Sequence, residues 1–168
     1  MNYNIHKQLP AAMRHENDLD KFFEAKNIIV KKVNMNTQRN GIDRLWTYPN
    51  GLRVSVEYKA DSKAAQTNNV FIETVSVDKD NKLGWAYTSL SQYLVYYIPP
   101  RKEIYMVWTG WLKLMVEKWK KEYKELPIKN VDENGRHSYF TYGMAIPINR
   151  FREECKAQRI DMKESPND

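Results

Sequence analysis

The stretch that decides how this chain is interpreted is GIDRLWTYPNGLRVSVEYKAD, residues 41–61. Its centre, Pro49-Asn50-Gly51, has the residue types of a tight turn. After the turn, apolar and polar side chains alternate with the period of two that is typical of a β-strand: Leu52, Val54, Val56 and Tyr58 against Arg53, Ser55, Glu57 and Lys59. We therefore expect a hairpin whose strands span residues 42–48 and 52–60.

Charged side chains lie where the first strand of this hairpin begins and where its second strand ends. Asp43 opens its first strand, and Glu57 and Lys59 lie near the end of its second strand. Because successive side chains of a strand point to opposite faces, Glu57 and Lys59 share a face. Two carboxylates and an amine at one sheet edge form a candidate divalent-metal site. The alternative is structural: Glu57 and Lys59 form the solvated face of an amphipathic strand, and Asp43 caps a turn.

The remaining pattern predicts an α/β fold with a mixed central β-sheet flanked by helices. Asn17 or Asp18 is expected to cap the first helix, and residues 34–40 and 61–69 are expected to be polar loops. Further strands are expected at 28–33, 70–77, 92–98, 103–108 and 139–146, helices at 111–126 and 149–159, and an exposed turn at 129–136. The expected organisation is an N-terminal arm (1–16), a single domain (17–160) and a tail (161–168).

Composition limits the partners and the compartment. The chain has 168 residues with 27 Lys and Arg against 21 Asp and Glu, a net charge of +6 that suits a polyanion such as DNA. Cys155 is the single cysteine, so no internal disulfide can form and a reducing cytoplasm is expected. The longest apolar run, residues 93–98, is too short to span a bilayer, so no membrane partner is expected.

The spacing of the hairpin residues resembles a known family. Asp43, then thirteen residues, then Glu57-Tyr58-Lys59 fits the pattern D-x(n)-(D/E)-x-K of the PD-(D/E)xK nuclease superfamily. The stretches G-x-D-R, V-E-Y-K-A-D, N-V-F-I-E and Y-L-V-Y-Y are similar to the small resolvase-type branch and its uncharacterised phage relatives. The resemblance covers roughly residues 18–98 and departs from the family in one place, where Ile42 stands instead of the proline. It implies an αβββαβ core of restriction-endonuclease type with C-terminal additions.

The resemblance also implies an activity. It predicts a Mg²⁺- or Mn²⁺-dependent deoxyribonuclease, selective for branched or junction DNA, encoded by a phage and active in the host cytoplasm. Asp43, Glu57 and the carbonyl of Tyr58 would bind the metal, and Lys59 would assist the attacking water. An acidic residue of the first helix contributes in this family; we expect Glu24, because Glu16 precedes the predicted cap. Resolvase-type relatives often act as dimers, so a homodimer is a state to test.

Other residues are candidates from the pattern itself. Glu73 shares a strand face with Phe71 and Val75, and a carboxylate there needs Lys59 or a metal as partner, so we expect an accessory role. Polar and basic residues in loops and on the helix predicted at 111–126 are candidate DNA contacts: Thr67, Asn68, Thr88, Gln92, Lys120 and Lys121. An ordinary polar loop and a solvated helix face are the alternative interpretations.

Two other classes of function fit the same sequence. A module without turnover on this fold would bind nucleic acid or a host protein. A structural or assembly protein would form large homo-oligomers without binding DNA. Phosphate-binding glycine loops, nucleophile elbows and dinucleotide fingerprints do not occur in the sequence, which argues against NTPases, serine hydrolases and dehydrogenases.

Overall fold

The computed structural model describes residues 2–131 and 136–163, which form two β-sheets and the helices around them. The larger sheet has six strands in the order β11-β8-β7-β4-β3-β2, and the smaller has five in the order β1-β9-β10-β5-β6. The larger sheet comprises β2 Ile29–Lys32, β3 Arg44–Thr47, β4 Arg53–Ala60, β7 Tyr93–Ile98, β8 Glu103–Trp108 and β11 Gln158–Asp161. The smaller comprises β1 Asn2–Asn4, β5 Asn69–Val77, β6 Lys82–Leu83, β9 Leu126–Val131 and β10 His137–Pro147.

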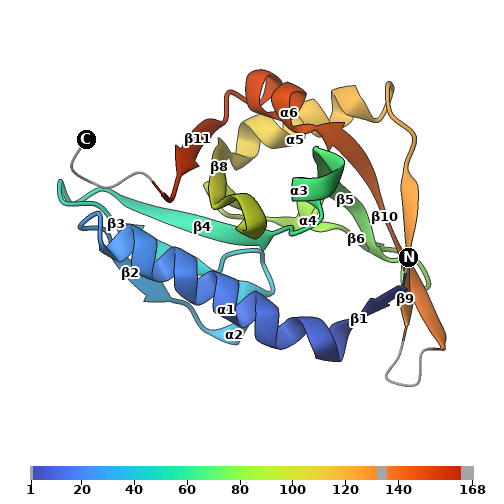
Figure 1. The fold of residues 1–168 in the computed structure, drawn as a ribbon, viewed down its shortest axis with the longest axis horizontal. Coiled ribbons are helices and arrows are strands. Elements are labelled where there is room, and N and C mark those ends of the chain that lie inside the picture. The colour runs from blue at the N-terminus through green and yellow to red at the C-terminus, as the bar shows by residue number, and fades with distance from the viewer. Residues whose placement is uncertain (1, 132–135, 164–168) are drawn as a thin grey trace.

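The helices lie on both sides of the larger sheet, with α1 along one side of β4 and α5 and α6 on the other (Figure 1). They are α1 Ile5–Glu24, α2 Met35–Gln38, α3 Ala64–Thr67, α4 Trp85–Thr88, η1 Pro99–Arg101, α5 Thr109–Trp119 and α6 Ile148–Glu154. The predicted α/β fold, a mixed sheet flanked by helices, is confirmed. Along the described ranges, every helix is too short or too polar to cross a membrane.

The larger sheet changes direction at β4. Strands β2, β3 and β4 pair antiparallel, whereas β4 pairs parallel with β7, with Glu57 opposite Leu94 and Lys59 opposite Tyr96. Parallel neighbours need a long crossover between them. Here residues 61–92 supply it, and they contribute α3, α4 and two strands of the smaller sheet, β5 and β6. The crossover therefore ties the two sheets together next to the end of β4.

Helix α1 covers the face of the larger sheet that carries Val56 and Tyr58. Leu19 and Phe23 of α1 pack with these side chains and with Trp46 of β3 in one buried cluster. The helix begins at Ile5, so the predicted start at Asn17 or Asp18 is wrong and residues 5–16 are helical. Polar residues dominate that segment, and Pro10 lies inside the helix, so its sequence lacks the apolar period that marks a helix.

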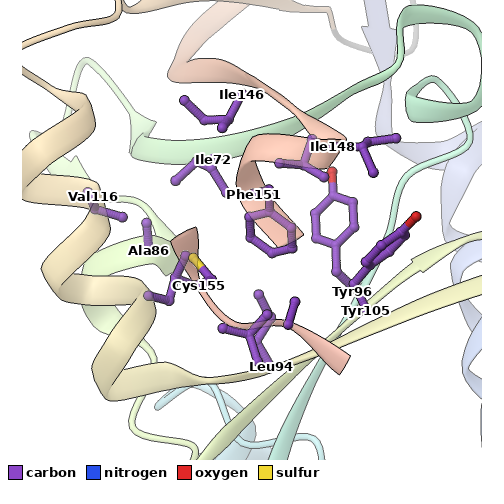
Figure 2. Packing of buried hydrophobic residues seen from close by; sticks show 14 of the residues in the cluster. Ile72, Ala86, Leu94, Tyr96, Tyr105, Val116, Ile146, Ile148, Phe151 and Cys155 are labelled. Carbon is purple, nitrogen blue, oxygen red and sulfur yellow. The ribbon is translucent and has the colours of Figure 1, made fainter. Parts of the chain in front are cut away.

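A second core fills the space between the two sheets, α5 and α6. Figure 2 shows Phe151 of α6 among Ile72, Ile146, Tyr96 and other apolar side chains of both sheets. Most of these residues are fully buried, and the ring of Trp119 at the end of α5 packs against the ring of Phe151. This core fixes the position of the smaller sheet relative to β7 and β8.

Element boundaries differ from prediction where a strand replaces an expected helix or turn. The helix predicted at 111–126 ends at Trp119, and β9 begins at Leu126; the helix predicted at 149–159 ends at Glu154, and β11 follows. Pairing of β9 with β10 and of β11 with β8 overrides the local helix preference. The predicted loops contain the short helices α2 and α3. Parts of the predicted turn (132–135) and tail (164–168) lie outside the described residues.

Candidate active site

Asp43 is held by the backbone of the neighbouring strand. It lies immediately before β3, and its amide donates to the carbonyl of Val56 at 2.8 Å. The amide of Tyr58 in turn donates to Asp43 Oδ2 at 2.8 Å. Burial raises the pKa of Asp43 above its ordinary value, although the Tyr58 amide and the charge of Lys59 act in the opposite direction. The carboxylate therefore has a fixed position next to the end of β4.

Glu57 and Lys59 share the face of β4 that points away from α1, as their spacing predicted. Glu57 is 3% exposed, whereas a third of the Lys59 side chain is exposed. Lys59 Nζ lies 2.7 Å from Glu57 Oε1. Burial lowers the pKa of Lys59, but the carboxylates of Glu57, Asp43 and Glu73 together more than offset this, so that the pKa is raised. The pair is an ammonium–carboxylate contact with one side open to solvent.

The second oxygen of Glu57 is left without a partner. Within the described part of the chain, Glu57 Oε2 is buried and accepts no hydrogen bond. Gly41 closes over it: a Cβ there would lie 3.1 Å from Glu57 Oε2 and 2.7 Å from the Cα of Ser89, and φ is +68°. A residue with a side chain would be strained at this position. A buried carboxylate oxygen without a donor is costly unless a ligand satisfies it.

Glu73 reaches the same place from the smaller sheet. Its Oε1 accepts a hydrogen bond from the Trp85 amide at 3.4 Å, and a Cβ on Gly84 would lie 2.8 Å from its Cγ. Burial raises the pKa of Glu73, while the charge of Lys59 acts against that rise. The predicted face is correct, since Glu73 and Phe71 line one cleft. Its accessory role stays a prediction.

These residues border a cleft of about 1080 Å³ between α1, the end of β4, β5 and the β9–β10 hairpin. Asp43, Tyr58, Lys59 and Glu73 line the cleft. Glu57 is not one of its lining residues and is joined to it by the ion pair with Lys59. One amine thus faces three carboxylates, those of Asp43, Glu57 and Glu73, whose charges all act on it.

The acidic residue expected from the first helix is not where it was predicted. Glu24 is the last residue of α1, is exposed, and its side chain forms no hydrogen bond or ion pair within the described residues. Two turns earlier, Glu16 lines the cleft, and its Oε2 lies 2.9 Å from Arg44 Nη2. Asp20 binds the same guanidinium at 2.8 Å. Glu16 was considered and set aside because the helix was expected to begin after it, whereas Asp20, inside the predicted helix, was not proposed for any role.

Of the six candidate DNA contacts, one lines the cleft and the other five do not. Thr67 lines the cleft, and its hydroxyl donates to the carbonyl of Lys63. Asn68 accepts from Arg101, and Thr88 donates to the carbonyl of Gly84. Gln92 accepts from the amide of Ser55.

The two candidate lysines, Lys120 and Lys121, are exposed beyond the end of α5, and Lys120 lies over the ring of Tyr87. Most of the six side chains hold local structure.

The donor set at the cleft fits a hard cation. In the described ranges, no group of three or more His, Cys, Asp or Glu side chains is close enough to hold a metal. Asp43, Glu57 and the carbonyl of Tyr58 supply a different set, two carboxylates and a backbone oxygen, and Mg²⁺ often takes few protein ligands and keeps its waters. The unpartnered Glu57 oxygen and the excess of carboxylates over amines both favour a bound cation.

Comparison with known proteins adds no relative to this picture. No family model, no curated protein and no solved structure matches the chain. The function is therefore inferred from the residues and the geometry of the site.

Proposed function

We propose that this protein is a Mg²⁺- or Mn²⁺-dependent deoxyribonuclease of PD-(D/E)xK type that hydrolyses phosphodiester bonds. The observation that carries the proposal is the convergence of Asp43, Glu57 and Lys59, with a buried Glu57 oxygen that has no partner among the described residues. The order α1, β2, β3, β4 and then β7, with β7 parallel to β4, supports the restriction-endonuclease-like core. In place of one second helix, α3, β5, β6 and α4 lie between β4 and β7.

The residues divide the work according to their chemistry. Asp43, Glu57 and the carbonyl of Tyr58 would hold the metal, which when bound lowers the pKa of a water and neutralises charge on the phosphate. Lys59 is paired with Glu57 and so carries a proton; it donates hydrogen bonds and stabilises negative charge on the phosphate oxygens. The Tyr58 amide keeps Asp43 Oδ2 oriented. Glu73 counters the charge of Lys59 from the other sheet.

The direct test is cleavage of branched, single-stranded and duplex DNA in Mg²⁺ or Mn²⁺. We expect wild-type protein to cut at least one substrate, and Asp43→Asn, Glu57→Gln and Lys59→Ala each to reduce the rate by on the order of a hundredfold or more. Glu153→Gln is the matched control, because Glu153 is an exposed carboxylate of α6 and does not line the cleft. Unchanged cleavage in the Glu57 and Lys59 variants would contradict the proposal.

Measurements of DNA binding, metal-dependent thermal shift and oligomer size separate the other classes of function. DNA binding without cleavage, with no metal-dependent thermal shift, would identify a module without turnover on this scaffold. Failure to bind any DNA, together with large homo-oligomers on a sizing column, would identify an assembly protein.

A further inference from the structure

The cleft beside the candidate site has a size that limits what it can hold. Its volume of about 1080 Å³ lies just above the range of roughly 300 to 1,000 Å³ found for small-molecule pockets. A DNA duplex, whose major groove alone is about 12 Å wide, is a much larger object. A short unpaired segment of a strand fits these dimensions, whereas a duplex would have to stay outside.

Among the Phe, Trp and Tyr residues that line the cleft, three are not fully buried: Phe71 from β5, Trp85 from α4 and Tyr139 from β10. All three are half-buried, so part of each side chain is open to the cleft. Lys59 Nζ lies 5.8 Å from the centre of the Trp85 ring. Burial and the charge of Glu73 raise the pKa of Tyr139.

The position of the Phe71 ring depends on a glycine, Gly143, in the neighbouring strand β10. A Cβ on Gly143 of β10 would lie 2.6 Å from Cζ of Phe71 and 2.5 Å from the carbonyl oxygen of Ile72. Gly143 therefore allows the ring to lie against β10 at the wall of the cleft. Ring faces at this wall are suited to stack on bases, and every base offers such a face.

The charges of the cleft by themselves disfavour a polyanion. Four carboxylates line it, those of Glu16, Asp43, Asp61 and Glu73, against the two amines of Lys59 and Lys63. A ligand there must be held largely by stacking and by polar groups such as the amide of Asn69, and only in small part by phosphate contacts. This balance differs from that of a protein that grips a duplex through a broad basic surface.

We infer that the cleft binds a short unpaired segment of a DNA strand, with bases stacked on Phe71 and Tyr139 and the adjoining phosphate at Lys59. The inference deepens the proposed function and rests on it, because it assigns a substrate class to the same site. The protein would then act where DNA has a single-stranded end, flap or gap beside the scissile bond.

The test is fluorescence anisotropy with a labelled oligodeoxythymidine of about ten nucleotides, within the range of roughly 4 to 16 nucleotides bound by single-strand sites. A blunt hairpin duplex is the competitor, and Ca²⁺ replaces Mg²⁺ to suppress cleavage. We expect the single strand to bind at least tenfold more tightly than the duplex. Phe71→Ala and Tyr139→Ala should each weaken binding by on the order of tenfold, because one base loses its stacking partner.

Two controls separate stacking from a general loss of structure. Tyr139→Phe keeps the ring and should keep the affinity. Trp108→Ala removes a 55% exposed ring that does not line the cleft, and it too should leave the affinity unchanged. The slope of log K against log salt should be near −1.4, since each of two lysines contributes about −0.7 on a single strand.

The inference is overturned if the duplex binds as tightly as the single strand, or if both alanine variants keep native melting curves and full affinity. A salt slope steeper than about −4 would also overturn it, since that slope indicates contacts with many phosphates. Cleavage restricted to duplex DNA would contradict this inference and leave the proposed nuclease intact. Single-strand binding that depends on Phe71, without cleavage of any substrate, would contradict the nuclease and leave the binding site.

Discussion

Two charged clusters contain the adjacent residues Asp43 and Arg44, one in each cluster. They differ in how completely their polar atoms are paired. The Arg44 cluster contains Arg44, Asp20 and Glu16: the guanidinium binds both carboxylates at 2.8 to 3.1 Å and the carbonyl of Asp43 at 3.0 Å. The Lys59 cluster contains Lys59, Asp43, Glu57 and Glu73. There a single amine serves three carboxylates, and Glu57 Oε2 has no donor among the described residues.

The contrast indicates different roles for adjacent residues. The Arg44 cluster, in which every guanidinium nitrogen donates to an acceptor, fixes how α1 sits on the larger sheet, and its buried cation has little capacity left for a ligand. A cluster with surplus negative charge, a raised pKa at Asp43 and an open side towards a cleft has that capacity. The Arg44 cluster should therefore support stability, and the Lys59 cluster should support function at some cost in stability.

Arg44→Met should give the largest loss of stability. Arg44 is 1% exposed, and its removal leaves the Asp20 carboxylate without its cation under α1. Breaking a buried pair in this way costs about 3 to 5 kcal/mol of unfolding free energy. Urea unfolding followed by circular dichroism measures the change, and the double variant with Asp20→Leu should recover a large part of it. A loss below about 1 kcal/mol for Arg44→Met would show that the cluster does not support the fold.

Mg²⁺ should stabilise the wild-type protein by a smaller amount. A ligand at a hundred times its dissociation constant adds about 2.7 kcal/mol to the free energy of unfolding. For a chain of this size, that corresponds to a rise in Tm of roughly 5 to 10 °C in differential scanning calorimetry. Asp43→Asn should abolish the rise, whereas Glu153→Gln should keep it. An equal rise in wild type and Asp43→Asn would place the cation elsewhere.

Asp43→Asn should stabilise the metal-free protein measurably at neutral pH, since the asparagine removes a carboxylate whose ionisation the folded state disfavours. Burial raises the pKa of Asp43 in the folded state, so its ionised form disfavours folding at any pH above the ordinary value of 3.8. The asparagine can still accept from the Tyr58 amide. The gain should be greatest near pH 7 and shrink as the pH falls towards 3.8. Denaturant titrations in EDTA between pH 4 and pH 7 would reveal a gain that is absent or inverted.

The features of the two clusters that depend on neighbouring residues could be predicted from the sequence. The pairings between residues far apart in the chain could not. The hairpin of β3 and β4 was predictable because its turn and its period of two are written in consecutive residues, and so was the shared face of Glu57 and Lys59. Arg44 finds Asp20 24 residues away and Glu16 28 residues away, and no local pattern marks that pairing. The same holds for Glu73 and the smaller sheet, in which Thr74 of β5 donates to the carbonyl of Tyr142 in β10, 68 residues away.

The smallest effects should come from changes at two carboxylates of α1. Glu24 is the one expected from the sequence, and Glu16 is the one that the structure brings to the cleft. Glu16→Gln removes a partly exposed partner of Arg44 and should cost about 0.5 kcal/mol, as is usual for such pairs. Glu24→Gln changes an exposed side chain outside both clusters, so neither the urea midpoint nor the cleavage rate should change measurably. If Glu24→Gln instead reduced cleavage tenfold while Glu16→Gln did not, α1 would have to contribute its carboxylate from its C-terminal end, and the division between the two clusters would fail.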